Sequence, residues 1–248
     1  MDVEFLRDPT AASFKKDNAL VVGDLHIGEE LMLEKQGVHF PGAEKALGES
    51  LLKAYKKSRA KRIVLLGDIK ASITYPDFDE YRHLREFFRP LQGIELHIAK
   101  GNHDSHLQEV LGQIGVNANI GKEILLDNAA YMHGMSLPSE QAMQRQYIFM
   151  AHLHMLVKIA DKPERAWIIS GIGRGAEKHY KNYNKNVKLV VAPAANSLLG
   201  GRVINDDKEE RSPVFREGIF DFRRSKIYST DGKLLGTVQK IARRAHVT

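Results

Sequence analysis

Aspartate, asparagine and histidine residues follow short apolar segments in the sequence of this 248-residue chain. The residues with ligand-type side chains at these places are Asp24, His26, Asp68, Asn102, His133, His152 and His154. Each pattern alone is weak, because a Gly-Asp pair after an apolar run is often only a turn. Taken together, these side chains are hard and borderline ligands that suit Mn, Fe, Zn or Mg. The chain has no cysteine, so a bound metal would need nitrogen and oxygen ligands.

The apolar segments in the first half predict buried strands that end at the candidate ligands. Three of them are each followed by a glycine and a polar residue, namely Ala19–Val22, 62–66 and 94–99. Helical periods alternate with them, over Ala43–Ser58, Phe78–Phe88 and 107–114. This alternation predicts a βαβ-type sheet, in which ligands bind beyond the carboxyl ends of the strands.

The second half has short strand candidates with few helices between them. They lie at 123–126, 130–132, 147–151, 166–169, 187–191, 203–205, 218–222, 226–228 and 234–239. Asp231-Gly232 is a hairpin turn signal between two of them. We expect a second, antiparallel or mixed sheet packed on the first. No linker interrupts the pattern, so residues 1–248 are predicted to form a single domain.

Composition sets broader limits on function. An apolar fraction of 43% and a charged fraction of 27% are ordinary for a soluble protein. No apolar run approaches the roughly 20 residues that span a bilayer, so we expect a soluble, cytoplasmic protein without a membrane partner. The net charge of +6 and a pI near 9.3 slightly favour a polyanionic partner such as nucleic acid.

The order of the motifs resembles that of the calcineurin-like metallophosphoesterase superfamily, whose pattern is D-x-H, G-D, G-N-H-[DE], a His and G-H-x-H. The chain reads Asp24-Leu25-His26, Gly67-Asp68, Gly101-Asn102-His103-Asp104, His133-Gly134 and Ala151-His152-Leu153-His154. The resemblance implies an α/β fold of four layers, an αββα sandwich of two packed mixed sheets flanked by helices. Two metals would then lie at the sheet edge.

Within the superfamily, the chain is similar to the small cytosolic branch that includes the DNA-ligase-associated repair phosphoesterases. The similar stretches are 24–41, Gly67-Asp68-Ile69-Lys70, 192–194, Gly200-Gly201 and 231–236. Two positions depart from the superfamily pattern. Ala71 stands where a second aspartate is frequent, and Ala151 stands where glycine is usual. Neither departure removes a metal ligand.

The resemblance implies two divalent metal ions, Mn²⁺ first, with Fe, Zn or Mg as alternatives. The first ion would be held by Asp24, His26, Asp68 and His154. The second would be held by Asp68, Asn102, His133 and His152, with His133 assigned mainly from its place in the family order. Asp68 would bridge them, since a carboxylate has two oxygens. In two-metal sites the ions lie roughly 3.5–4 Å apart and clamp the attacking and leaving oxygens.

The chemistry implied is hydrolysis of a phosphodiester by a hydroxide that bridges the metals and attacks phosphorus in line. His103 is the candidate general acid that protonates the leaving oxygen. The alternative for His103 is a structural histidine held by Asp104 or by a nearby carbonyl.

Candidate contacts to the rest of the substrate come from the segment 174–188, where basic residues alternate with tyrosines. We consider Arg174, Lys178, Tyr180 and Lys181 as substrate-binding residues, because basic and aromatic side chains together suit single-stranded nucleic acid. The alternative is an exposed, solvated loop.

Three functions fit these patterns. The first is a DNA-repair-type nuclease or phosphodiesterase acting on nucleic acid. The second is a small-molecule phosphoesterase or cyclic-nucleotide phosphodiesterase. The third is a non-catalytic scaffold that has kept a phosphoesterase fold, which the complete ligand set disfavours.

Overall fold

The computed structural model describes residues 2–159, 162–204 and 212–245. Its first sheet has six strands in chain order, with β1–β3 antiparallel and β3–β6 parallel. The strands are β1 (Val3–Leu6), β2 (Ala11–Phe14), β3 (Ala19–Val22), β4 (Arg62–Leu65), β5 (Glu95–Ala99) and β6 (Asn119–Gly121).

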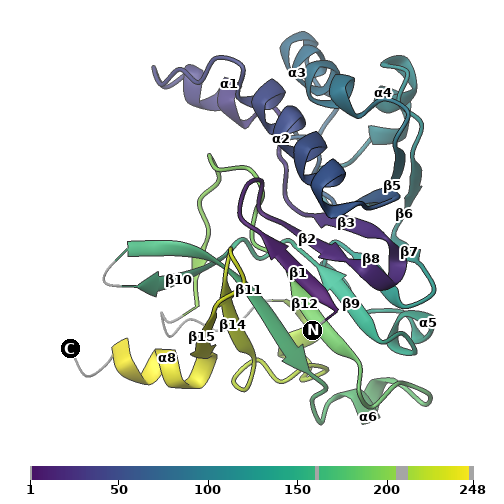
Figure 1. The fold of residues 1–248 in the computed structure, drawn as a ribbon, viewed down its shortest axis with the longest axis vertical. Coiled ribbons are helices and arrows are strands. Elements are labelled where there is room, and N and C mark those ends of the chain that lie inside the picture. Colours follow the sequence, from purple (N-terminus) through teal and green to yellow (C-terminus); the bar gives the residue numbers. More distant parts are fainter. Residues whose placement is uncertain (1, 160–161, 205–211, 246–248) are drawn as a thin grey trace.

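Helices cover the outer face of this sheet (Figure 1). They are α1 (Glu29–Glu34), α2 (Ala43–Ser58), α3 (Phe78–Phe88) and α4 (Leu107–Gln113), with short 3₁₀ turns at Lys15–Asp17 and Arg89–Leu91. The buried residues Leu51 of α2 and Phe87 of α3 pack in one cluster with Leu20, Ile63 and Ile98 of the sheet. The helical periods at Ala43–Ser58 and Phe78–Phe88 therefore predicted both helices with their bounds.

The second sheet has nine strands. Seven follow the order β13-β10-β11-β12-β9-β8-β7, while β14 pairs with β11 and with β15. The strands are β7 (Glu123–Leu125), β8 (Ala129–Met132), β9 (Tyr147–Met150), β10 (Met155–Ile159), β11 (Lys162–Gly171), β12 (Lys188–Val191), β13 (Arg202–Val203), β14 (Lys226–Ser229) and β15 (Leu234–Thr237). Its outer face packs against α5 (Glu140–Met143), α6 (Ala176–His179), α7 (Pro213–Arg216) and α8 (Val238–Ala245).

The inner faces of the two sheets share one core. Val21 and Val64 of the first sheet lie in the same buried cluster as Phe149 and Val190 of the second. Trp167 is fully buried there and stacks on Phe5, with ring centroids 4.6 Å apart. The central strands are covered on both faces, which explains why they are continuous apolar runs rather than alternating ones. Helix, sheet, sheet and helix form the predicted four-layer sandwich.

Several predicted elements differ from the structure. Residues 218–222, predicted as a strand, form a turn in which Phe220 makes only an isolated bridge to Ile172. The strand predicted at 234–239 stops at Thr237, where α8 begins. Of the strand predicted at 203–205, residue 203 belongs to β13, and residue 205 lies outside the described residues. The hairpin turn at Asp231-Gly232 is confirmed, and Gly232 has a φ of 85°.

The described helices include none with both the length and the apolar character needed to span a lipid bilayer.

Candidate metal centre

Three neighbouring strands of the first sheet bring their carboxyl ends to one edge. Val22, the last residue of β3, pairs with Leu65 of β4, and Leu65 pairs with Ile98 of β5. These strands are parallel, so the loops that follow them leave the sheet on the same side. Those loops hold the candidate side chains of the first half, namely Asp24, His26, Asp68, Asn102 and His103.

The second sheet supplies three more side chains from the parallel strands β8 and β9. His133 directly follows β8, and His152 and His154 follow β9. The two sheets approach closely here, because a Cβ atom at position 23 would lie only 2.6 Å from the Cβ of Ala151. Gly23 thus makes room for the methyl group that Ala151 has in place of the expected glycine.

Asp68 lies at the centre of one group. Its Oδ2 is 3.1 Å from His133 Nε2 and 3.4 Å from His26 Nε2. Its Oδ1 accepts a hydrogen bond of 2.9 Å from the backbone N–H of His103. A single carboxylate therefore touches groups from both sheets, as a bridging ligand must.

Asp24 lies at the centre of the second group. Its Oδ1 is 3.6 Å from His154 Nε2, and the backbone N–H of His152 lies 3.1 Å from each carboxylate oxygen. The ring of His152 closes the cluster, with Nδ1 3.0 Å from His133 Nε2. The ligand atoms of Asp24, His26 and His154 lie within 4.8 Å of one another, as do those of Asp68, His133 and His152.

The backbone at these residues is strained. The left-handed region is occupied at Asp24 (φ 51°), His26 (41°), Asp68 (49°), His152 (72°) and His154 (43°). Each such non-glycine residue costs about 1–3 kcal/mol, and such residues concentrate at functional sites. The folded core must hold these five residues in that conformation against its cost, which is the behaviour of a preorganised site.

Electrostatics separates the roles of the cluster residues. Burial of Asp68 opposes its ionisation, but the imidazoles of His133 and His26 outweigh burial and hold its pKa well below the usual range. Burial works against the charged form of His133, yet Asp68 and Asp24 raise its pKa. Burial, together with the neighbouring His133, lowers the pKa of His152. The Asp68 carboxylate is thus kept ionised among imidazoles.

The cluster fits a divalent cation. His26 Nε2 is buried and makes no hydrogen bond within the described part of the chain, although it lies near Asp68. A buried polar atom normally has a partner. Carboxylate oxygens and imidazole nitrogens are ligands that Mn, Zn and Fe share. A cation between them would satisfy the free nitrogen and balance the carboxylates.

His103 lies beside this cluster, oriented by a backbone carbonyl. Its Nδ1 is 2.5 Å from the carbonyl oxygen of Ala71, so Nδ1 carries the proton and donates it. Its ring packs edge-on against His26, with centroids 4.6 Å apart. The main chain at Ala71 thus orients the ring of His103, whose Nε2 makes no hydrogen bond among the described residues.

Asp104 is one of the two partners predicted for a structural His103, but in the structure it has a different role. Its side chain is fully buried and accepts hydrogen bonds from the backbone N–H groups of Ile69 and Gly101, each 2.8 Å. Burial raises the pKa of Asp104, and these two hydrogen bonds offset only part of that rise. Asp104 thereby ties the Asp68 loop to the Asn102 loop.

Asn196 is a second positioning residue, and sequence reasoning missed it. Its amide donates 2.8 Å to the carbonyl of Leu25, between Asp24 and His26. No sequence motif marks it, because its partner is 171 positions away.

Asn102 is the one predicted ligand that the structure leaves apart from the cluster contacts. It follows Gly101 at the correct strand end, but its side chain is exposed and makes no hydrogen bond among the described residues. Its role as a ligand stays a prediction.

The basic segment does not reach this edge. Gly171 of β11 pairs with Lys188 of β12, and Lys188 pairs with Tyr147, the first residue of β9. The segment 172–187 therefore lies at the start of β9, whereas His152 and His154 follow its end. In Figure 1, α6 lies on the opposite side of the view from α1, which follows the His26 loop.

Side-chain burial also bears on the predicted substrate-binding residues of this segment. Tyr180 is buried and its hydroxyl donates 2.8 Å to the carbonyl of Pro138, so its ring is not a surface for stacking. Arg174, Lys178 and Lys181 are exposed at the far end of the sheet. Tyr180 therefore offers no stacking surface, and the position of the other three residues at the opposite end of β9 disfavours their contact with a substrate bound at the cluster.

Replacing Lys178 and Lys181 by glutamate should leave catalysis intact. If the cluster is a hydrolase centre, the hydrolysis rates of a small diester and of single-stranded DNA should not change measurably, because both lysines lie at the opposite end of β9 from the cluster. Initial rates with both substrates measure this. A selective loss with DNA alone would contradict the assignment, because it would require the strand to extend to α6.

Comparison with known proteins bears on the fold. No protein-family model matches the chain, and no curated protein matches its sequence. Eighteen chains of solved structures match it in fold. One is the nuclease MPE of Pseudomonas putida, at 14% identity, with a TM-score of 0.61 and 92% of each chain covered. The chain therefore shares its fold, over nearly its whole length, with this nuclease.

Proposed function

We propose that this chain is a metal-dependent phosphoesterase that hydrolyses phosphodiester bonds in nucleic acid. The observation that supports this most directly is the convergence of Asp24, Asp68 and their histidines at one edge, with His26 Nε2 buried and without a hydrogen bond. The shared fold with a nuclease supports the same reaction class.

The proposed ligands divide into two sets that share Asp68. Asp24, His26 and His154 complete one set, and His133, His152 and Asn102 complete the other. Two divalent cations held there would activate a water molecule and neutralise charge on the phosphoryl oxygens. The observed contacts of Asp68 with His26 and His133 support its bridging position.

His103 is proposed to donate the proton that the leaving oxygen needs. Its Nδ1–H is held by the Ala71 carbonyl, so Nε2 is the atom that gives up a proton. Its backbone N–H, bound to Asp68, fixes its distance from the ligand set. Proton transfer by a positioned histidine contributes about 10²–10⁴ in rate.

The open side of the cluster supports a large substrate. His103, His152 and His154 are partly exposed, and Asn102 is exposed. A loop at 71–77 lies beside them, because Ala71 holds His103 and the carbonyl of Ile73 accepts from Ser105. This loop leads to Phe78, whose side chain is 81% exposed. An exposed ring that follows this loop is suited to stacking on a base.

Replacing Phe78 by alanine should weaken the binding of nucleic acid selectively. A base stacked on an aromatic ring contributes about 1–3 kcal/mol, so we expect KM for single-stranded DNA to rise about tenfold. KM for a small diester should not change. Leu234→Ala, another exposed apolar residue, is the matched control. An equal KM for DNA in wild type and Phe78→Ala would rule out stacking of a base on Phe78.

A substrate panel tests the proposed function itself. The metal-free chain is supplied with Mn²⁺ and given a phosphomonoester, a small phosphodiester, a cyclic nucleotide and single-stranded DNA. We expect diester and DNA hydrolysis that EDTA abolishes. Hydrolysis of only the monoester or the cyclic nucleotide would favour a small-molecule enzyme. Absence of all hydrolysis, in protein shown to bind the metal, would favour the scaffold.

A further inference from the structure

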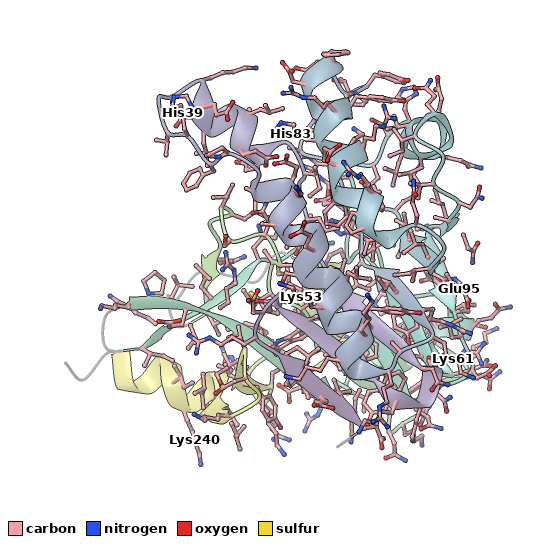
Figure 2. All side chains as sticks on the ribbon, turned by 45° about the horizontal axis from the view of Figure 1, so that its top comes forward. His39, Lys53, Lys61, His83, Glu95 and Lys240 are labelled. Carbon is pink, nitrogen blue, oxygen red and sulfur yellow. The ribbon has the colours of Figure 1, made fainter. Side chains whose placement is uncertain are left out.

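A second group of titratable side chains lies where α1, α2 and α3 meet. Glu30 comes from α1, Glu44 from the first turn of α2 and His83 from α3. One ligand-type atom of each lies within 4.8 Å of the others. Figure 2 shows His83 among these helices. None of the three belongs to the ligand set proposed above.

These side chains are buried, and one of them lacks a partner. Glu30, Glu44 and His83 are 2%, 9% and 8% exposed. His83 Nδ1 is 2.6 Å from Glu30 Oε1, a short hydrogen bond. Glu44 Oε2 is 3.9 Å from the same nitrogen, which is too far for a hydrogen bond, and it has no hydrogen-bond partner among the described residues. A buried carboxylate oxygen in that position is strongly unfavourable.

Charge within the group does not balance either. Two carboxylates, each able to carry a negative charge, face one imidazole, which supplies at most one positive charge. Arg7 and Arg165 line the adjoining cavity, but the described structure shows no ion pair between either of them and Glu30 or Glu44. Arg165 donates instead to the carbonyls of Asn196 and Leu199, at 2.9 and 3.3 Å.

We propose that Glu30, Glu44 and His83 form a separate divalent-cation site that joins the three helices. Two carboxylates and one imidazole suit a borderline ion such as Zn²⁺ or Mn²⁺. Bonds of about 2.1 Å to a common ion place ligand atoms roughly 3–4 Å apart, which small movements from the observed positions achieve. The entering cation takes the place of the proton on His83 Nδ1, which leaves to solvent.

The surroundings of this group provide an entry path for the ion and indicate which part of the fold it would stabilise. Glu30 and Glu44 line a cavity of about 310 Å³, through which a hydrated ion reaches them. Glu30 lies four positions after His26, so an ion here fixes the start of α1 and the loop before it. The role is structural, because no part of the group contacts the candidate metal centre in the described structure.

Zinc stoichiometry tests this site in the full chain. Metal-free wild type, Glu44→Gln and Glu49→Gln are dialysed against Zn²⁺, and bound metal per chain is measured by elemental analysis. Glu49 is an exposed residue of the same helix and receives the same substitution. We expect Glu44→Gln to bind one zinc fewer than wild type and Glu49→Gln to match wild type. Circular dichroism verifies that each variant is folded.

A second variant and a second measurement guard against misfolding and residual binding. Glu30→Gln with Glu44→Gln should also lose one zinc, and the rise in Tm on adding Zn²⁺ should be smaller than in wild type. Folded Glu44→Gln and double variants that bind as much zinc as wild type would overturn the proposal. The site is independent of the proposed activity. If the candidate metal centre bound nothing, wild type would hold one zinc and Glu44→Gln none.

Discussion

Asp68→Asn is expected to abolish nearly all phosphodiester hydrolysis while leaving the fold intact. The asparagine keeps the volume and one acceptor oxygen but loses the negative charge that lies between His26 and His133. Without it, the two proposed cations would lose their common ligand. A cation acting on phosphoryl oxygens supplies several kcal/mol of transition-state stabilisation, and a loss of about 4 kcal/mol corresponds to roughly 10³-fold in rate.

The measurement is kcat/KM for a small diester in saturating Mn²⁺, with circular dichroism to verify folding. Asp79→Asn is the matched control, because Asp79 is exposed on α3 and, among the described residues, pairs only with Arg82, at 3.4 Å. We expect the control to retain wild-type activity. Full activity in Asp68→Asn would rule out the bridging role of Asp68 and, with it, the mechanism proposed for this edge.

His103→Asn is expected to slow hydrolysis in a way that depends on the leaving group. The substitution removes Nε2, the only imidazole nitrogen of His103 not already engaged with Ala71. The backbone N–H that binds Asp68 is kept, so the proposed ligand set should stay in place. With an alkyl leaving group, which needs a proton, we expect a loss of about 10²–10⁴.

A nitrophenyl leaving group provides the internal control for His103. It departs as a stable anion, so its hydrolysis should fall far less in His103→Asn than that of the alkyl ester. Metal content, measured in parallel, should match wild type. Equal losses with both esters would show that His103 positions the substrate or its neighbour His26 instead of donating a proton.

The elements that position the site were accessible from local sequence patterns. The apolar runs before Asp24, Asp68 and Asn102 correspond to β3, β4 and β5, because strands buried on both faces must be apolar throughout. The helical periods likewise predicted α2 and α3. The first hairpin, β1–β2, was missed, since Glu4 and Ser13 interrupt its strands, which therefore do not read as continuous apolar runs. Residues 218–222 were apolar for a different reason, as part of the core packed around a turn.

The candidate ligands were selected by residue type and strand-end placement, and the structure brings six of them together. Their role in holding metal is still a prediction, and Asn102 stays outside the observed contacts. Their left-handed backbone was not predictable, because nothing local in Asp24 or His152 requires a positive φ. The surrounding core holds those turns in place, together with hydrogen bonds such as those from Asn196 to Leu25 and from His152 to Asp24.

The sequence by itself determined the alternation of strands and helices, the set of candidate nitrogen and oxygen ligands, and the edge at which most of them lie. These follow from local periodicity and from the common direction of parallel strands. Only the tertiary structure decided that Tyr180 is buried and that the basic segment lies at the opposite end of β9. It alone brought Glu30, Glu44 and His83 together. Such facts depend on strand register and helix packing between residues far apart in the chain, which no local pattern encodes.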